Sequence, residues 1–369
     1  MNQVDQLFQP FKYGPLQTPN RLVMAPMTRE FSPGNAPNEK VVEYYRRRAA
    51  GGVGLIITEG TCVNHKAANG YPDVPFFYGE EALNGWKKVV DAVHADGGKI
   101  VPQLWHVGGC RRLGTEPDAD VPGYSPSGMV MPGKVTGRVM TKEDILDVID
   151  AFAQAAKDAQ AIGFDGVELH GAHGYLIDQF FWDGTNQRDD EYGGDLDRRS
   201  RFAIEIIKAV RAAVGPDFPI IFRWSQWKQQ DYSARLVETP EALRTFLQPL
   251  VEAGVDIFHC STRRFWEPEF DGSDLNLAGW TKKLTGKPTI AVGSVGLNAD
   301  FVPNDGTENF REAETASIDN LVERINAEEF DLVAVGRAII ANPEWPNLVK
   351  QGLLDKSKAY EHKMLETLA

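Results

Sequence analysis

Eight short apolar runs recur along the 369-residue chain, and most of them are followed by a stretch with helical periodicity. The runs are almost continuously apolar, which is typical of strands that are buried on both faces of a parallel sheet. They lie at 21–27, 53–60, 99–106, 166–171, 219–225, 255–262, 288–294 and 330–337. Eight strand–helix units predict an α/β fold, a (β/α)8 or TIM barrel, that forms a single domain over residues 1–369. A doubly wound sheet is the rival fold, but no Gly-x-Gly-x-x-Gly motif follows the first run.

The helix that the sequence defines best spans residues 141–163. Thr141 can cap its first turn, with Asp144 in the capping-box position, and Gly163 can end it. Its apolar face consists of Ile145, Ile149, Phe152 and Ala156. Further helices are expected at 38–50, 80–96, 198–213, 239–253, 276–285, 319–328 and 341–350.

Two connections are longer than the loops that usually join barrel elements. Residues 107–140 follow the third strand and are rich in Gly and Pro. Loops that follow barrel strands lie at the catalytic end, so we expect this segment to be a lid. Residues 297–318 follow the seventh strand, and their polar and acidic character predicts an excursion from the barrel.

Charge and cysteine content argue against several classes of protein. The net charge of −13 disfavours a nucleic-acid partner, because nucleic acids are bound through basic patches. The cysteines Cys62, Cys110 and Cys260 form no Cys-x-x-Cys pair, so neither a zinc knuckle nor an iron–sulfur cluster is supported. The chain shows no secretory signal pattern at its start and no stretch of membrane-spanning length. We therefore expect a cytoplasmic protein with reduced thiols.

Most of the predicted strands end in a hydrogen-bonding side chain or a glycine, and a barrel has its active site at these carboxyl ends. The residues concerned are Met27, Thr28, Glu59, Gly60, Gln103, Trp105, His106, His170, His173, Tyr175, Arg223, Gly293, Ser294, Gly336 and Arg337. In the stretch HGAHGYL, at 170–176, only Gly and Ala separate His170, His173 and Tyr175. Such small residues would leave the three polar rings free to face a ligand.

Some of these residues also have a purely structural interpretation. His106 is expected to be a core histidine with its hydrogen bonds satisfied, and Glu59 has no assigned role. Arg223 could form an ion pair or meet an anionic ligand. A single Gly at a strand end is usually a tight turn, but Gly293 and Gly336 follow the seventh and eighth strands, where barrels frequently bind phosphate.

A series of motifs in this order resembles the Old Yellow Enzyme family of FMN-dependent ene-reductases. The motifs are RLVMAPMTR (21–29), EG (59–60), QLWH (103–106), HGAHGYLIDQF (170–180), NQRDDEYGG (186–194), FRWS (222–225) and VAVGRAIIANPEW (333–345). They span most of the chain, so the resemblance implies a barrel that binds FMN non-covalently.

The resemblance also implies which residues hold the flavin. They are Pro26, Met27, Thr28, Gly60, Gln103, His170, Arg223, Gly293, Ser294, Gly336 and Arg337. The Thr28 hydroxyl is expected near a ring carbonyl, Gly60 would let the ring system approach its strand, and Gln103 would bond the pyrimidine edge. Arg223 would lie near flavin N1, where a fixed cation stabilises the charge of the reduced ring. The last four residues would hold the phosphate, as their places at the seventh and eighth strands also predict.

The catalytic roles implied by the resemblance fall on His170, His173 and Tyr175. The two imidazoles would bind the carbonyl oxygen of an activated alkene, such as an enone, enal or maleimide, and Trp105 would lie beside this substrate. Hydride would pass from flavin N5 to the β-carbon and a proton from Tyr175 to the α-carbon. NADH or NADPH would reduce the flavin at the same face, and nitro compounds or nitrate esters are alternative substrates. A small molecule is the expected partner, and both a monomer and a homo-oligomer are compatible with the sequence.

Two other functions remain open at this point. A metal-dependent hydrolase could use His170 and His173 as ligands, but catalytic zinc normally takes three protein ligands and no third is evident. A non-catalytic flavin or phosphate carrier would not need an acid such as Tyr175. A visible spectrum of the purified protein distinguishes a flavin from a metal.

Overall fold

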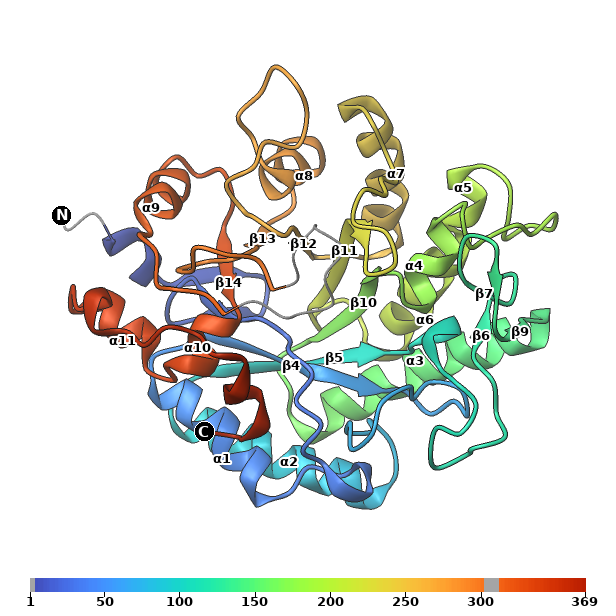
Figure 1. Ribbon diagram of the computed structural model, residues 1–369, viewed down its shortest axis with the longest axis horizontal. Coiled ribbons are helices and arrows are strands. Elements are labelled where there is room, and N and C mark those ends of the chain that lie inside the picture. Colours follow the sequence, from blue (N-terminus) through green and yellow to red (C-terminus); the bar gives the residue numbers. More distant parts are fainter. Residues whose placement is uncertain (1–3, 302–311) are drawn as a thin grey trace.

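The computed structural model describes residues 4–301 and 312–369, and its centre is a closed barrel of parallel strands (Figure 1). Around the barrel the order is β10-β11-β12-β13-β14-β3-β4-β5. In chain order these strands are β3 (Leu22–Met24), β4 (Leu55–Cys62), β5 (Lys99–Trp105), β10 (Val167–His173), β11 (Ile220–Lys228), β12 (Ile257–Ser261), β13 (Thr289–Val292) and β14 (Leu332–Val335). Each overlaps one predicted apolar run, so the (β/α)8 barrel is confirmed and the doubly wound alternative is wrong.

Helices cover the outside of the barrel, as the periodicity predicts. They include α1 (Glu39–Ala50), α2 (Glu80–Ala95), α3 (Lys142–Ile162), α6 (Arg201–Val214), α7 (Pro240–Ala253), α8 (Leu277–Thr285), α9 (Asp319–Asn326) and α11 (Trp345–Lys350). The predicted capping box of α3 is present, because Thr141 and Asp144 exchange side-chain and backbone hydrogen bonds. Gly163 ends this helix in the left-handed conformation, with φ 96°.

Several short elements were not predicted. Strands β1 (Phe11–Tyr13) and β2 (Leu16–Thr18) form a hairpin whose Phe11 and Leu16 belong to the same buried cluster as the barrel interior. The helices α4 (Leu176–Phe181), α5 (Leu196–Arg199) and α10 (Arg337–Ala341) are short. At four to six residues each, these helices are too brief for a periodic pattern to stand out in the sequence.

The segment 107–140 carries small strands of its own. Strand β6 (Tyr124–Ser125) pairs with β9 (Arg138–Val139), and β7 (Met129–Met131) pairs with β8 (Lys134–Val135). The guanidinium of Arg111 is buried and donates to the backbone carbonyls of Asn69, Thr115, Asp118 and Val121. The bond to Asn69 ties the segment to the loop after β4, and the other three bonds lie within the segment. Its role as a lid stays a prediction.

The predicted excursion at 297–318 is described only in part, because residues 302–311 lie outside the described residues. Its flanks are anchored by β-bridges, Leu297 to Thr315 and Ala313 to Tyr360. Across 4–301 and 312–369, no helix has both the length and the apolar character needed to cross a membrane.

Candidate active site

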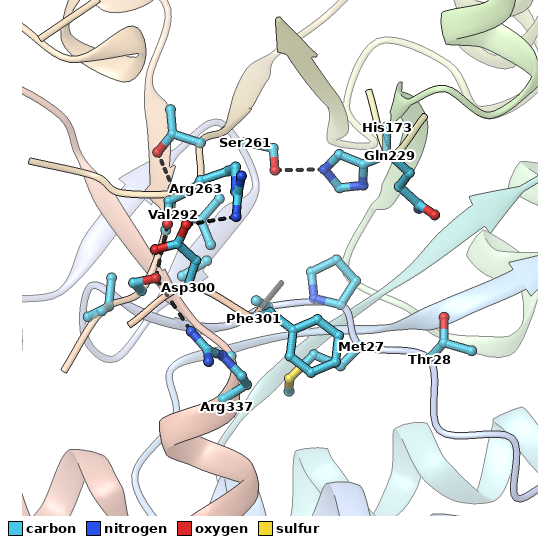
Figure 2. A pocket seen from close by; sticks show the side chains of 18 of the residues that line it. Met27, Thr28, His173, Gln229, Ser261, Arg263, Val292, Asp300, Phe301 and Arg337 are labelled. Atoms are coloured by element: carbon cyan, nitrogen blue, oxygen red, sulfur yellow. Dashed lines mark hydrogen bonds and ion pairs between the residues drawn. The ribbon is translucent and has the colours of Figure 1, made fainter. Parts of the chain in front are cut away.

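A pocket of about 550 Å³ opens at the carboxyl ends of the barrel strands (Figure 2). Its volume is in the range of small-molecule and cofactor sites. Of the residues predicted from the sequence, those that line it are Pro26, Met27, Thr28, His173, Tyr175, Arg223, Gly293, Ser294, Gly336 and Arg337. The closed barrel therefore brings together groups from five of its strands: four sets lie at strand ends as expected, and Arg223 lies within β11.

Gly60 and Trp105 lie behind the pocket lining and contact each other. A Cβ atom at position 60 would lie 2.4 Å from Cε3 of the Trp105 indole, so this position has no room for a larger side chain. The indole in turn packs edge-on against the Tyr175 ring, with centroids 4.9 Å apart. The glycine therefore makes room for Trp105, and its predicted contact with a flavin ring stays a prediction.

Gln103 is not among the residues that line the pocket and belongs to a buried polar group. Its Nε2 donates to Glu168 Oε1 at 2.8 Å, and Glu168 Oε2 lies 2.7 Å from Nδ1 of His259. All three side chains are buried in the barrel interior. The sequence prediction missed Glu168 and His259, although a charged or imidazole side chain inside an apolar run was a signal for them. The contact of Gln103 with a pyrimidine edge stays a prediction.

The imidazoles of His170 and His173 meet edge to face, with centroids 5.2 Å apart. Burial lowers the pKa of both rings well below the usual value of histidine, and the nearby Arg223 acts in the same direction. Both rings are therefore neutral at pH 7. Nε2 of His173 lies 2.7 Å from Oγ of Ser261, whereas Nδ1 of His170 has no hydrogen-bond partner among the described residues.

A left-handed turn presents His173 and Tyr175 to the pocket. His173 has φ 67° and Gly174 has φ 77°, so two consecutive residues adopt a conformation that few side chains tolerate. The backbone N–H of His173 donates to Ser225 Oγ at 3.0 Å, and that of Gly174 donates to Asp178 Oδ2 at 2.8 Å. These bonds stabilise an unusual backbone geometry at the end of β10.

The hydroxyl oxygen of Tyr175 has two polar neighbours. Nε2 of Gln229 lies 2.9 Å from it, and the hydroxyl oxygen of Tyr71 lies 3.0 Å from it. Burial raises the pKa of the Tyr175 phenol well above its usual value of 10.0, so it is protonated at pH 7. Sequence analysis did not identify Tyr71, Gln229 or Ser261, because nothing in the local sequence shows that they meet residues far away along the chain.

The opposite side of the pocket carries Ser294 and Arg337. Gly293, with φ 147°, and Ser294, with φ 50°, turn the chain directly after β13. Nη2 of Arg337 donates to Ser294 Oγ at 3.4 Å and to the carbonyl of Ala299. Burial lowers the pKa of Arg337 from its usual value, but the group stays cationic at neutral pH.

Unpartnered donors in this pocket match an anionic, hydrogen-bonding cofactor such as FMN. Nε of Arg223 and Nη1 of Arg337 are buried and lack a hydrogen-bond partner within the described part of the chain, and so does Nδ1 of His170, whose ring contacts the lining residues His173 and Tyr175. A buried polar atom without a partner is costly, and a bound ligand would satisfy it. The arginines in particular can only donate, so each matches an acceptor or a negative charge.

The other candidates have structural explanations. His106 bonds His65 through Nε2 and receives the N–H of Gly108 on Nδ1, so its expected place as a satisfied core histidine is confirmed. Glu59 is buried and accepts the backbone N–H of Arg29 at 3.0 Å. Among residues 4–301 and 312–369, no group of three or more His, Cys, Asp or Glu side chains could hold a metal ion, so the metal-hydrolase alternative has no support.

Comparison with known proteins gives consistent matches over almost the whole chain. Residues 6–356 match the model of the NADH:flavin oxidoreductase / NADH oxidase family. The 12-oxophytodienoate reductase 2 of Arabidopsis thaliana is 35% identical over 351 residues, which cover 92% of this chain and 87% of the relative. A putative 12-oxophytodienoate reductase 4 of Oryza sativa is 44% identical over 215 residues, but the match covers only 57% of this chain and 56% of the rice protein.

Solved structures show the same architecture. Morphinone reductase in complex with tetrahydroNAD superimposes with a TM-score of 0.81 and is 29% identical, covering 97% of this chain and 93% of its own. An Old Yellow Enzyme homologue from Zymomonas mobilis gives a TM-score of 0.80 at 25% identity and covers 98% of this chain and 96% of its own.

Proposed function

The chain belongs to the NADH:flavin oxidoreductase / NADH oxidase family, which includes the Old Yellow Enzymes, and from this premise we propose that it reduces the C=C bond of activated alkenes. Flavin oxidoreductase activity follows from the family. The reduction of activated alkenes is supported by one observation above all. A neutral imidazole and a protonated phenol, those of His173 and Tyr175, line one pocket that also carries unpaired cationic donors, and the neutral ring of His170 contacts both of them.

FMN, bound non-covalently, is the proposed cofactor. Arg337, Ser294, Gly293 and Gly336 would hold its phosphate at one side of the pocket. Arg223 and the segment Pro26, Met27 and Thr28 would contact the ring system, with His170, Gly60 and Gln103 behind. A bound, reduced flavin would supply the hydride, and its reduction would come from NADH or NADPH.

His173 can bind a substrate oxygen only if its proton lies on the ring nitrogen that Ser261 does not contact. Ser261 Oγ lies 2.7 Å from Nε2 of His173 and 3.5 Å from Nη2 of Arg223. Because the guanidinium can only donate, the Ser261 hydroxyl proton is available for Nε2. This pairing leaves Nδ1–H of His173 as a donor toward the carbonyl oxygen of an enone, where it would draw electron density from the β-carbon.

Tyr175 is the proposed proton donor to the α-carbon. Its hydroxyl lies in the pocket, its ring contacts His170 at a centroid distance of 5.1 Å, and it stays protonated at neutral pH. A general acid must hold its proton until charge develops on the substrate, and a phenol with a raised pKa does so. Enones, enals and maleimides fit this arrangement, and nitro compounds or nitrate esters remain alternative substrates. The cytoplasmic location and the oligomeric state, a monomer or a homo-oligomer, stay predictions.

The variant Tyr175→Phe tests this function. It should leave flavin reduction by NADH or NADPH unchanged within about twofold and slow the reduction of 2-cyclohexenone by about 100-fold or more, because general acid catalysis contributes on this scale. Stopped-flow absorbance of the flavin measures the two half-reactions separately. Tyr192→Phe, which removes a hydroxyl bonded to Glu205 away from the pocket, is the matched control. Equal losses in both half-reactions of Tyr175→Phe would contradict the role of proton donor.

A further inference from the structure

Two side chains contact the oxygen atom from which Tyr175 would release its proton. Gln229 directly follows β11 and lies beside His173 on the pocket wall (Figure 2). Its Nε2 is 2.9 Å from the Tyr175 hydroxyl oxygen, and the Tyr71 hydroxyl is 3.0 Å away. Both contacts reach the Tyr175 hydroxyl oxygen itself, whereas Ser225 and Asp178 bond the backbone of the turn before it.

The hydrogen-bonding capacity of the phenol determines what these contacts can do. A phenol oxygen has one proton and can accept hydrogen bonds, whereas the amide nitrogen of Gln229 can only donate. The Tyr71 hydroxyl can donate or accept. When Gln229 and Tyr71 both donate to the Tyr175 oxygen, the proton of Tyr175 has no acceptor between them and is left to point toward a substrate.

We propose that Gln229 and Tyr71 form a two-donor site that stabilises the tyrosinate left when Tyr175 protonates the substrate. The proposal rests on the proposed function, in which the Tyr175 O–H bond breaks and a C–H bond forms at the α-carbon. The negative charge then resides on the Tyr175 oxygen. Because that oxygen is buried, fixed donors aimed at it are worth more than water-exposed ones.

The same contacts give the tyrosinate a way to recover its proton. Tyr71 is only partly buried and lines the pocket, and the proposal assigns proton exchange with solvent to its hydroxyl. It can pass its proton to the Tyr175 oxygen and take another from water, which restores both phenols. Gln229 is the donor that stays in place throughout, and we therefore assign it as a positioning residue that acts through Tyr175.

Backbone and ring contacts place both donors beside the phenol. The backbone N–H of Gln229 donates to the His173 carbonyl at 3.3 Å. The Tyr71 ring stacks on Trp105 with centroids 5.5 Å apart, and its backbone N–H donates to Asn69 Oδ1 at 3.1 Å. Asn69 is held by the segment 107–140, since its carbonyl accepts from Arg111 at 2.6 Å and its amide donates to the Glu116 carbonyl at 2.9 Å. That segment thus positions a group that touches Tyr175.

The test compares Gln229→Met and Gln229→Glu with a neighbouring control. Methionine keeps the length of the side chain without a donor, and a carboxylate can only accept. Gln230→Met is the matched control, because the Gln230 amide bonds the sulfur of Cys110 and not the phenol. Both Gln229 variants should slow reoxidation of the reduced holoenzyme by 2-cyclohexenone about 10- to 100-fold, somewhat below the usual loss for a single donor because Tyr71 remains. Flavin reduction by NADH or NADPH should stay within about twofold of the wild type.

A double-mutant cycle with Tyr175→Phe separates this role from a structural one. In the Tyr175→Phe background, Gln229→Met should have no further effect, because the group it acts on is gone. An equal loss in both backgrounds, or an equal loss in Gln230→Met, would overturn the proposal. Failure of the proposed function looks different, since wild type would then not reduce the enone or Tyr175→Phe would reduce it at the wild-type rate. Flavin content and thermal midpoint of each variant report whether it has folded.

Discussion

Burial sets the charge of each side chain in the site. His170 and His173 are neutral and Tyr175 is protonated because each charged form would lose its water of solvation. The two arginines stay charged because the pKa of a guanidinium is so high, although burial lowers that of Arg223 to about 10. The result is a pocket that offers several hydrogen-bond donors, which suits a substrate oxygen and an anionic cofactor.

Glu59 carries the clearest pH-dependent contribution to stability at this scale. Its carboxylate accepts the backbone N–H of Arg29, next to the segment that lines the pocket, and burial raises its pKa from 4.5 to about 7. A raised pKa in the folded state means that stability is fully present below about pH 4.5 and falls as pH rises toward 7. We expect the stability of Glu59→Gln not to fall in this way. The difference in the free energy of unfolding between wild type and variant should therefore change by about 3 kcal/mol between about pH 4.5 and 7.

Urea denaturation of the holoenzyme between pH 4.5 and 8 measures this difference. Other carboxyl groups titrate in the same range, so the quantity of interest is wild type minus variant and not either curve alone. Glu241→Gln, on the exposed face of α7, is the control and should run parallel to wild type. Parallel curves for Glu59→Gln as well would show that Glu59 ionises freely in the folded protein.

At the scale of elements, the extension of β11 shapes the left-handed turn at the end of β10. His173 pairs with Lys228 in the ladder, and Trp227 stacks on the His173 ring with centroids 4.4 Å apart. Nζ of Lys228 forms an ion pair with Asp178 at 2.7 Å, and both side chains are fully buried. Burial raises the pKa of Asp178 and lowers that of Lys228, while their mutual attraction opposes both shifts. Since Asp178 also accepts from Gly174, the pair fixes the turn before Tyr175.

Removing one partner of this ion pair should lower the free energy of unfolding more than removing both charges. Lys228→Met leaves the buried carboxylate of Asp178 without its partner, and we expect the free energy of unfolding to fall by about 3–5 kcal/mol. The double variant Lys228→Met with Asp178→Asn has no buried charge and keeps an oxygen for Gly174, so it should recover at least half of that loss. Urea midpoints of the three proteins provide the measurement. A double variant as unstable as the single one would show that the charges themselves do not matter.

The sequence allowed the barrel to be predicted, but not the elements that decorate it. Buried parallel strands need continuous apolar runs, so each strand left a signal that short helices and the 11–18 hairpin did not. Strands β10 and β11 extend to His173 and Lys228, beyond the predicted ends at 171 and 225, because ladder pairing resumes after a register shift between Gly171 and His173. Such a shift depends on the neighbouring strand and has no local sequence pattern.

The same limit applies to the site. Side chains at strand ends could be predicted, because the barrel topology alone places them at one face. Their partners could not, because Tyr71, Gln229 and Ser261 contact Tyr175 and His173 from 104, 54 and 88 residues away. Gln103 is a further example. The sequence predicts it as a site residue, but its hydrogen bond to Glu168 is evident only from the closed barrel.

At the scale of the whole molecule, the strand order of the closed barrel places Arg337 and His173 at different ends of one pocket. β14 pairs with β3, so Arg337 lies close to the segment that carries Met27, whereas His173 and Gln229 come from β10 and the end of β11. The chain has a net charge of −13, yet Arg223, Arg263 and Arg337 all line this pocket. Arg263 is paired with Asp300 at 2.7 Å and Glu30 also lines the pocket, so the positive charge available to an anionic group comes from Arg223 and Arg337.

This arrangement predicts that the protein distinguishes FMN from riboflavin through Arg337. Arg337→Ala should weaken FMN binding by about 10- to 100-fold, because a hydrogen bond to a charged group contributes roughly 1.5–3 kcal/mol. Riboflavin lacks the phosphate, so its affinity should be the same for wild type and variant within about twofold. Fluorescence titration of the flavin-free protein measures both affinities, with the exposed Arg244→Ala as control. An equal loss for the two flavins would place the phosphate elsewhere in the pocket, since only a contact with the phosphate separates them.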